Sequence, residues 1–380
     1  MSLTVSPPPS TARVVEVDAV RGFALAGILV ANIGFLADPG HAVVGQSPIS
    51  DGPVAFGITA FVLTKFYVIF SFLFGYSFTL QMRAAERAGA SVRARTVRRC
   101  LALLAIGLLH GFLFWIGDIL TLYAALGLVL LLFRNIKPRT AVIVGSVIIG
   151  LLTLLWLALA GLSLLDPAAG QVPPVDTAAA ARALDLATAG PLDFLRLQTE
   201  LYPQLVAMIW LFQGPTALAM FLFGLAAGKS RLLEEPRSLS RVQWVGFGVG
   251  IPSGIFFAWT SGSSGALETL GLAVNTLTSL LLAAAYVATL VRLVRRVPAV
   301  ARVLAPAGHM AASNYIGQSV LSCLVFTGYG LALAGRLSPI AVMGVAAVIY
   351  AVLATFSALW LRRHRHGPVE YGLRRITNWS

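Results

Sequence analysis

The sequence predicts an all-α membrane protein, a single polytopic bundle of about ten transmembrane helices with both termini in the cytoplasm. Three observations carry this prediction. The 380 residues are 58% hydrophobic and only 11% charged, with a mean hydropathy of +0.84, whereas a soluble domain has about 25% charged residues. Apolar runs long enough to cross a hydrocarbon core of about 30 Å recur along the chain. Basic residues gather in alternate connections between these runs, as the positive-inside rule requires.

One transmembrane domain, residues 17–361, is predicted to hold the membrane spans. The fourth span is short and depends on a tight turn at Gly117-Asp118. No run alternates apolar and polar residues in the way a membrane β-barrel requires. The predicted spans are 17–37, 54–82, 97–116, 118–133, 140–165, 203–228, 242–261, 266–294, 308–334 and 338–361.

The distribution of charge supports the number of spans. Most of the 28 lysines and arginines fall in the predicted cytoplasmic connections and tails, whereas the outer side holds only Arg182, Arg196 and Arg336. If one span were missed or wrongly added, all later connections would move to the opposite side of the membrane and this asymmetry of charge would disappear. The net charge of +13 therefore reflects topology, and we expect the lipid bilayer as a partner and no nucleic acid.

Three segments outside the spans have distinct compositions. Residues 1–16 form a polar, Pro-rich tail without the pattern of a cleaved signal peptide. The long outer connection, 166–202, contains an Ala-rich stretch that predicts a short helix on the outer surface; a simple spacer and a cover over a cavity are the alternatives. The basic tail, 362–380, is typical of a segment that lies on anionic headgroups.

Ionisable residues inside the predicted spans are the first candidates for a site, because a buried charge in a membrane is costly and usually functional. His110 and Asp118 lie eight residues apart, on either side of the predicted turn. A histidine oriented by a carboxylate is a general base. The alternatives are a structural histidine bonded to a neighbouring helix, and an aspartate that caps the fourth helix. Lys65 is a third catalytic candidate; it either extends to the interface or pairs with a carboxylate, and Asp118 is the nearest in depth.

The first span carries three further polar residues. Asp18 and Arg21 are three residues apart and share a helix face, which predicts an ion pair; the alternative is that Arg21 binds an anion such as a phosphate. Asn32 follows Arg21 by eleven residues, three helical turns, and lies on nearly the same face. These three residues are candidates for holding a co-substrate.

Later spans supply weaker candidates for a substrate site. Asn314 and Gln318 are four residues apart on one helix face, and His309 begins the same predicted span; most such amides only join helices. No cluster has the spacing of a metal site, and we interpret Cys100 and Cys323, both in apolar runs, as packing residues. No permanently bound cofactor is predicted.

Six strings along the chain form a recognisable set: EVDAVRGFALAGILVANI (16–33), KFYVIFSFLFGYSF (65–78), RRCLALLAIGLLHGFLFWIGDILTLYA (98–124), MFLFGLAAGKSRLL (220–233), GHMAASNYIGQS (308–319) and GPVEYGLRR (367–375). In order and spacing they resemble the YeiB-like family of bacterial membrane proteins (domain of unknown function 418). One departure is His309, where that family more usually has arginine. The resemblance covers nearly the whole chain and implies a multi-pass protein of the bacterial cytoplasmic (inner) membrane.

The first string is also similar to that of wider membrane acyltransferase families, in which a first-helix arginine is followed eleven positions later by a histidine. The matching residues here are Arg21 and Asn32, so a base would have to come from elsewhere, and His110 is the best placed. The resemblance thus implies an acyltransferase with acyl-coenzyme A as co-substrate and a small-molecule or glycan acceptor. A transporter of an anionic or amphipathic metabolite and a non-catalytic membrane component are the alternatives; a second copy of the chain is a further candidate partner.

Overall fold

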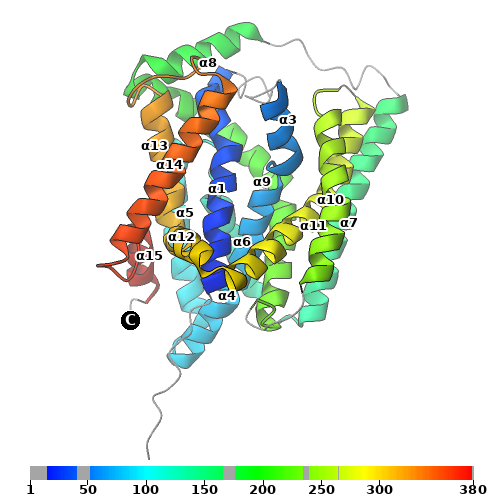
Figure 1. Ribbon diagram of the computed structural model, residues 1–380, viewed down its shortest axis with the longest axis vertical. Coiled ribbons are helices and arrows are strands. Elements are labelled where there is room, and N and C mark those ends of the chain that lie inside the picture. The colour runs from blue at the N-terminus through cyan, green and yellow to red at the C-terminus, as the bar shows by residue number, and fades with distance from the viewer. Residues whose placement is uncertain (1–14, 41–51, 166–175, 234–238, 264, 379–380) are drawn as a thin grey trace, which may run out of the picture.

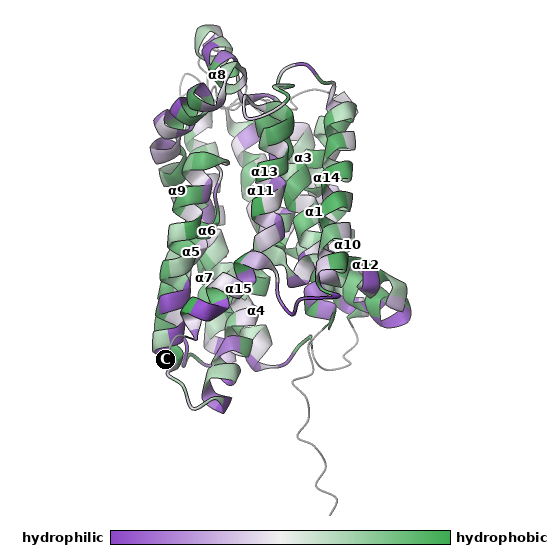
Figure 2. Cartoon of the chain, turned by 90° about the vertical axis from the view of Figure 1, so that its left-hand side faces the viewer, coloured by the Kyte–Doolittle hydropathy of each residue, from purple (hydrophilic) through white to green (hydrophobic). Residues whose placement is uncertain are grey.

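The computed structural model of the protein describes residues 15–40, 52–165, 176–233, 239–263 and 265–378. Regular structure in these residues is helical throughout, and most of the helices stand side by side in one bundle (Figure 1). Eight candidate spans among them are long and apolar enough to cross a membrane. Hydrophobic residues dominate the middle of the bundle, and hydrophilic residues gather toward its two ends (Figure 2). The chain is therefore a polytopic helical membrane protein, as its composition predicts.

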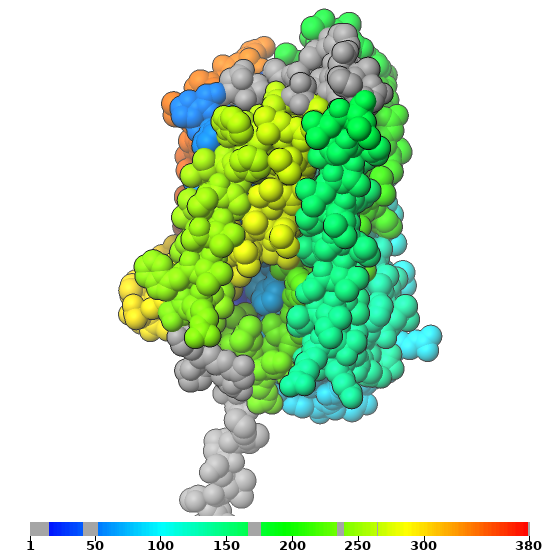
Figure 3. Space-filling model, turned by 90° about the vertical axis from the view of Figure 1, so that its right-hand side faces the viewer, coloured from blue at the N-terminus to red at the C-terminus, as the bar shows by residue number. Residues whose placement is uncertain are grey.

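Seven helices follow predicted spans closely. The shortest of them, α6, has only 13 residues and begins directly after the predicted Gly117-Asp118 turn. These helices are α1 (Val15–Ala37), α5 (Val92–Leu113), α6 (Leu120–Leu132), α7 (Pro138–Leu165), α10 (Ser240–Thr260), α11 (Ala266–Arg296) and α14 (Pro339–Trp360). Helices α7, α10 and α11 form one face of the molecule, which is visibly hollowed between them (Figure 3).

The predicted span 54–82 is not one continuous helix. It divides into α3 (Gly52–Phe61) and α4 (Lys65–Arg87), and Thr64 between them has a positive φ of 70°. The Thr64 side chain bonds to the Leu63 carbonyl (2.5 Å) and accepts from the Asn275 amide (3.1 Å), which holds the break in place. Lys65 therefore lies in the first turn of α4 and not in the middle of a helix.

The predicted span 308–334 is also divided. It comprises the end of α12 (Pro298–His309), all of α13 (Ala311–Phe326) and a returning segment. In that segment the Leu331 N–H donates to the Leu324 carbonyl (2.8 Å) and the Ala334 N–H donates to the Phe326 carbonyl (3.0 Å), so the chain folds back along the end of α13. The sequence predicted one span here because the returning segment is as apolar as the helix before it, and composition does not show that the chain turns back.

Helix α8 (Thr177–Ala189) is the helix predicted in the outer connection, and it lies across one end of the bundle, opposite the end that holds the C-terminus (Figure 1). We call these the α8 end and the C-terminal end. Ala183 and Ala187 of α8 pack with Leu36 and Trp115 in one buried cluster. Helix α9 (Pro191–Lys229) then begins well before the predicted span 203–228 and continues through Pro203 and Pro215. Residues 166–175 of this connection lie outside the described residues.

The basic tail forms α15 (Pro368–Thr377), which contacts α5 and α13 at the C-terminal end and buries Leu373. The tail is thus docked on the bundle through an apolar side chain, beyond the membrane-surface contact that its charge predicts. Residues 1–14, which make up most of the Pro-rich tail, and residues 379–380 lie outside the described residues.

Candidate functional site

The predicted His110–Asp118 pair is present and fully buried. His110 Nδ1 lies 2.8 Å from Asp118 Oδ1, and His110 Nε2 lies 2.9 Å from the Oγ of Ser319. The three side chains come from the last turn of α5, the turn before α6 and the middle of α13. They form one continuous line of hydrogen bonds, serine to histidine to aspartate, which joins α13 to the α5–α6 turn although Ser319 lies 209 residues beyond His110.

Glycine allows α5 and the start of α6 to come this close. A Cβ atom on Gly107 would lie 2.8 Å from Asp118 Oδ2 and 2.7 Å from the Thr121 nitrogen, closer than real Cβ atoms approach. The same Oδ2 accepts the Thr121 N–H at 2.8 Å and so satisfies a donor in the first turn of α6. Asp118 therefore both contacts His110 and accepts an N–H from the first turn of α6, although Ile119 occupies the N-cap position of that helix.

The carboxylate determines how the imidazole is protonated. An ionised aspartate can only accept hydrogen bonds, so the neutral His110 ring carries its proton on Nδ1 and donates it to Asp118. This leaves the lone pair of Nε2 to accept the Ser319 hydroxyl. The arrangement is that of a general base whose conjugate acid is stabilised by a buried carboxylate.

Ser319 borders a small cleft toward the α8 end of the bundle, with room for about one water molecule. Polar lining residues include Asn32 of α1 together with Gln318 and Ser322 of α13, and Trp115 also lines the cleft. Asn32 and Gln318, predicted from separate spans, thus meet at this cleft. Gln318 donates to the Leu25 carbonyl at 3.0 Å, which joins α13 to α1.

Trp115 adds a hydrogen-bond donor that the structure does not use. Its ring is 5% exposed, and its Nε1 atom is buried without a hydrogen-bond partner among the described residues. A buried donor left without a partner costs about 1–3 kcal/mol. The indole lines the same cleft as Ser319, and the edge of the ring that carries Nε1 packs beside Gly117.

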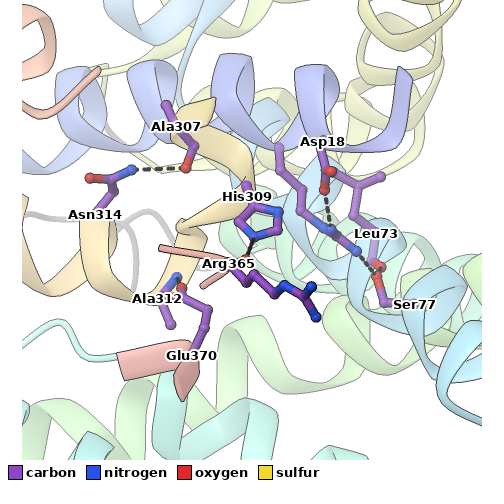
Figure 4. Close-up of polar contacts among 10 residues, drawn as sticks. Asp18, Leu73, Ser77, Ala307, His309, Ala312, Asn314, Arg365 and Glu370 are labelled. Atoms are coloured by element: carbon purple, nitrogen blue, oxygen red, sulfur yellow. Dashed lines mark hydrogen bonds and ion pairs between the residues drawn. The ribbon is translucent and has the colours of Figure 1, made fainter. Parts of the chain in front are cut away.

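The predicted Asp18–Arg21 ion pair is confirmed. The Arg21 guanidinium donates to Asp18 Oδ1 at 2.7 Å and also to the Ser77 hydroxyl of α4 (Figure 4). Arg99 of α5 lies near Arg21, Arg374 and Glu370, and its Nε is buried without a hydrogen-bond partner in the described part of the chain. Arg21 therefore belongs to a set of arginines at the C-terminal end, about 16 Å along α1 from Asn32.

Lys65 does not join His110 and Asp118. Its Nζ donates to Asn275 Oδ1 of α11 at 2.9 Å and lies 3.4 Å from the Thr59 carbonyl oxygen. The Phe257 ring centroid lies 5.3 Å from the same nitrogen. The prediction that Lys65 pairs with Asp118 is wrong, because Asn275 supplies the oxygen and the helix break at Thr64 places the lysine beside α11.

The remaining candidates separate into different places. Asn314 donates to the Ala307 carbonyl and to the Ser357 hydroxyl, each at 2.8 Å, and so joins α13 to α12 and α14. His309 Nε2 lies 2.8 Å from the Arg365 carbonyl oxygen at the C-terminal end (Figure 4). Only Gln318 of the three lies at the cleft, and the shared face of Asn314 and Gln318 does not make one substrate site.

Two site residues were not among the sequence candidates. Ser319 follows Gln318 directly, but serine is common in membrane helices and nothing in its neighbourhood marks it. Trp115 resembles an ordinary interface aromatic. Both cysteines are buried and free, and no group of three or more metal-ligating side chains is present in the described ranges.

Comparison with known proteins shows what the chain is similar to. Residues 226–380 match the model of a family described as "Protein of unknown function (DUF418)". The chain is 33% identical to the "Uncharacterized protein YxaH" of Bacillus subtilis, over 99% of this chain and 97% of that protein. It is 27% identical to an "Uncharacterized 39.9 kDa protein in amylase 3'region" of Bacillus acidopullulyticus, over 96% and 94%. It is 26% identical to the "Uncharacterized protein YeiB" of Escherichia coli, over 96% of each.

Proposed function

The chain belongs to the DUF418 family, and from its buried site we propose that it is a membrane acyltransferase. The reaction moves an acyl group from a coenzyme A thioester to the hydroxyl or amine of a small molecule or glycan. The observation that carries the proposal is the buried Asp118–His110 pair, whose Nε2 faces a hydroxyl beside a cleft. A base of this kind removes the proton of an attacking hydroxyl or amine, which typically accelerates a reaction about 10²–10⁴-fold.

The cleft also offers donors for the charge that develops during acyl transfer. The thioester carbonyl oxygen becomes an oxyanion when it is attacked, and donors fixed in a buried site stabilise it. Trp115, whose Nε1 has no hydrogen-bond partner in the described ranges, lines this cleft together with Asn32. We assign the stabilisation of the oxyanion to Trp115 and Asn32 and not to Lys65, because Lys65 is bonded to α11.

The C-terminal end has the charge that the donor requires. Coenzyme A carries phosphates at one end and its thiol at the other, so phosphates near Arg21, Arg99 and Arg374 would leave the thioester free to extend along α1 toward Asn32. Arginine suits this role because its planar guanidinium binds phosphate through two parallel hydrogen bonds. In this assignment the C-terminal end faces the cytoplasm of a bacterium, in line with the positive-inside rule, and the acceptor is bound toward the outer face.

The test uses the full chain, purified in detergent or nanodiscs, with a panel of acyl-coenzyme A compounds and free coenzyme A as control. Binding to the folded state raises the melting temperature by mass action, and release of free thiol measures turnover with a panel of sugar and amine acceptors. His110→Gln should lower turnover about 10²–10⁴-fold without loss of folding. His364→Gln, at an exposed histidine of the C-terminal end, is the matched control.

Turnover that survives His110→Gln would show that His110 is not the base. Folded protein without a thermal shift or thiol release from any thioester would contradict the acyltransferase proposal. Flux of an anion across a proteoliposome membrane, driven by a proton gradient and independent of thioester, would then assign the buried polar groups to transport.

A further inference from the structure

The hydroxyl that His110 is positioned to deprotonate belongs to the protein itself. We infer that Ser319 is the nucleophile, and that the acyl group is carried on its Oγ as a covalent ester between donor and acceptor. The inference deepens the proposed acyltransferase function and rests on it for the identity of the donor. It changes the mechanism from direct transfer between two bound substrates to two successive displacements at one serine.

Both ring nitrogens of His110 already have partners within the protein. Asp118 takes Nδ1 at 2.8 Å and Ser319 takes Nε2 at 2.9 Å, so both ring nitrogens are engaged. An external acceptor reaches Nε2 only after the Ser319 hydroxyl has left it. Formation of an ester at Ser319 removes that hydroxyl proton and frees Nε2 for the acceptor, so the two steps follow from one geometry.

Ser319 also lies beside open space. A serine that only joins two helices needs no open space beside it, whereas Ser319 borders the cleft. Trp115, whose Nε1 is buried without a hydrogen-bond partner among the described residues, lines the same cleft. Ser322, one turn further along α13, lines the same cleft but makes no hydrogen bond to His110, so access to the cleft and contact with the base can be tested separately.

In the first displacement, Ser319 Oγ attacks the thioester carbonyl carbon while its proton passes to His110 Nε2. The carbon–sulfur bond breaks, and the coenzyme A thiolate leaves with the proton from the imidazolium. In the second, an acceptor hydroxyl gives its proton to Nε2 and attacks the ester, and the bond to Ser319 Oγ breaks. The serine oxygen takes that proton back, so enzyme, atoms and charge return to their starting state, with Asp118 stabilising the imidazolium in both steps.

The test is independent of the acyl donor. An alkyl fluorophosphonate reacts with an activated serine, forming an oxygen–phosphorus bond and releasing fluoride. We expect one adduct on the purified full chain, located at Ser319 by mass spectrometry of its peptides. Ser319→Ala and His110→Gln should lose the adduct, whereas Ser322→Ala should keep it; thermal unfolding confirms that each variant is folded.

A second measurement uses an acyl-coenzyme A without acceptor. We expect a rapid release of thiol approaching one equivalent per protein, together with an acyl ester on the Ser319 peptide. Ser319→Cys, which keeps a nucleophile at the same position, should retain an acylated product as a thioester.

The outcomes distinguish this inference from the proposed function. Turnover of acyl-coenzyme A in folded protein without any Ser319 adduct or ester would overturn the inference and leave direct transfer by His110. An adduct at Ser319 without reaction of any thioester would support the nucleophile and overturn the assigned donor. Equal labelling in the His110→Gln variant would overturn the inference, because the serine would then be reactive without its base.

Discussion

The close approach of α5 and α6 predicts that Gly107→Ala damages both stability and the site. The new Cβ would lie 2.7 Å from the Thr121 nitrogen and 2.8 Å from Asp118 Oδ2. Rotation of a side chain does not relieve the first contact, because the nitrogen is backbone. Overpacking of this kind costs about 1–3 kcal/mol, and weakening of the Thr121–Asp118 hydrogen bond adds about 1 kcal/mol.

The helix propensity of alanine opposes this cost, since alanine in a helix interior is favoured over glycine by about 0.5–1 kcal/mol. The net expectation is therefore a loss of about 1–3 kcal/mol. Gly150→Ala is the matched control, because α7 leaves open space where its Cβ would lie, and only the favourable term remains. Thermal and denaturant-induced unfolding, followed by circular dichroism, measures both variants.

Displacement of Asp118 should also lower fluorophosphonate labelling of Ser319, because the carboxylate orients His110. Gly107→Ala protein that is as stable as the Gly150→Ala variant, with labelling unchanged, would refute the packing of α6 against α5 and with it the geometry of the site.

Three further predictions concern residues outside the cleft. Lys65→Met should leave stability unchanged or raise it, because the lysine is buried without an ion pair among the described residues and burial of an unpaired charge is costly; marked destabilisation in thermal unfolding would mean that the charge is well compensated. Glu370→Ala should expose α15 to trypsin at a cost of about 1–2 kcal/mol, because the carboxylate accepts the Ala312 N–H (2.7 Å) and Ser313 hydroxyl (2.6 Å) at the start of α13; unchanged protection would contradict this. Arg21→Ala should weaken thermal stabilisation by acyl-coenzyme A, whereas Arg336→Ala, at an exposed residue near the α8 end, should not; equal shifts would remove Arg21 from donor binding.

The helices were predictable from sequence where a single property decides them. Runs such as 140–165 and 338–361 are apolar over a full membrane thickness. In lipid the backbone hydrogen bonds of a spanning segment must be made within the protein, and a single apolar run satisfies them as a helix. The breaks at Thr64 and after Phe326 were not predictable. The hydrogen bond at Thr64 comes from Asn275, 211 residues away. The bonds after Phe326 form only once the chain has turned back along α13. Local composition does not contain either contact.

The site was predictable where its residues are of types that are rare in membrane helices. His110 and Asp118 stand out because an ionisable group in an apolar run is exceptional, and their separation by a turn brings them together. Lys65 stands out for the same reason, yet its predicted depth gave no information on which neighbour it faces. Ser319 is an unremarkable residue in sequence, and only the packing of α13 against α5 shows that its hydroxyl meets His110.

Helix α1 connects the two polar regions that the proposed reaction needs. At the C-terminal end Arg21 is held by Asp18 and Ser77, and at the cleft Asn32 lies beside Ser319 and Trp115. The cleft itself has room for about one water, so an acyl group can enter only if residues that line the cleft move. Gln318 lines the cleft and bonds α13 to the Leu25 carbonyl of α1. Loosening of this contact is one way to widen the cleft, and it would act on the helix that also carries Arg21.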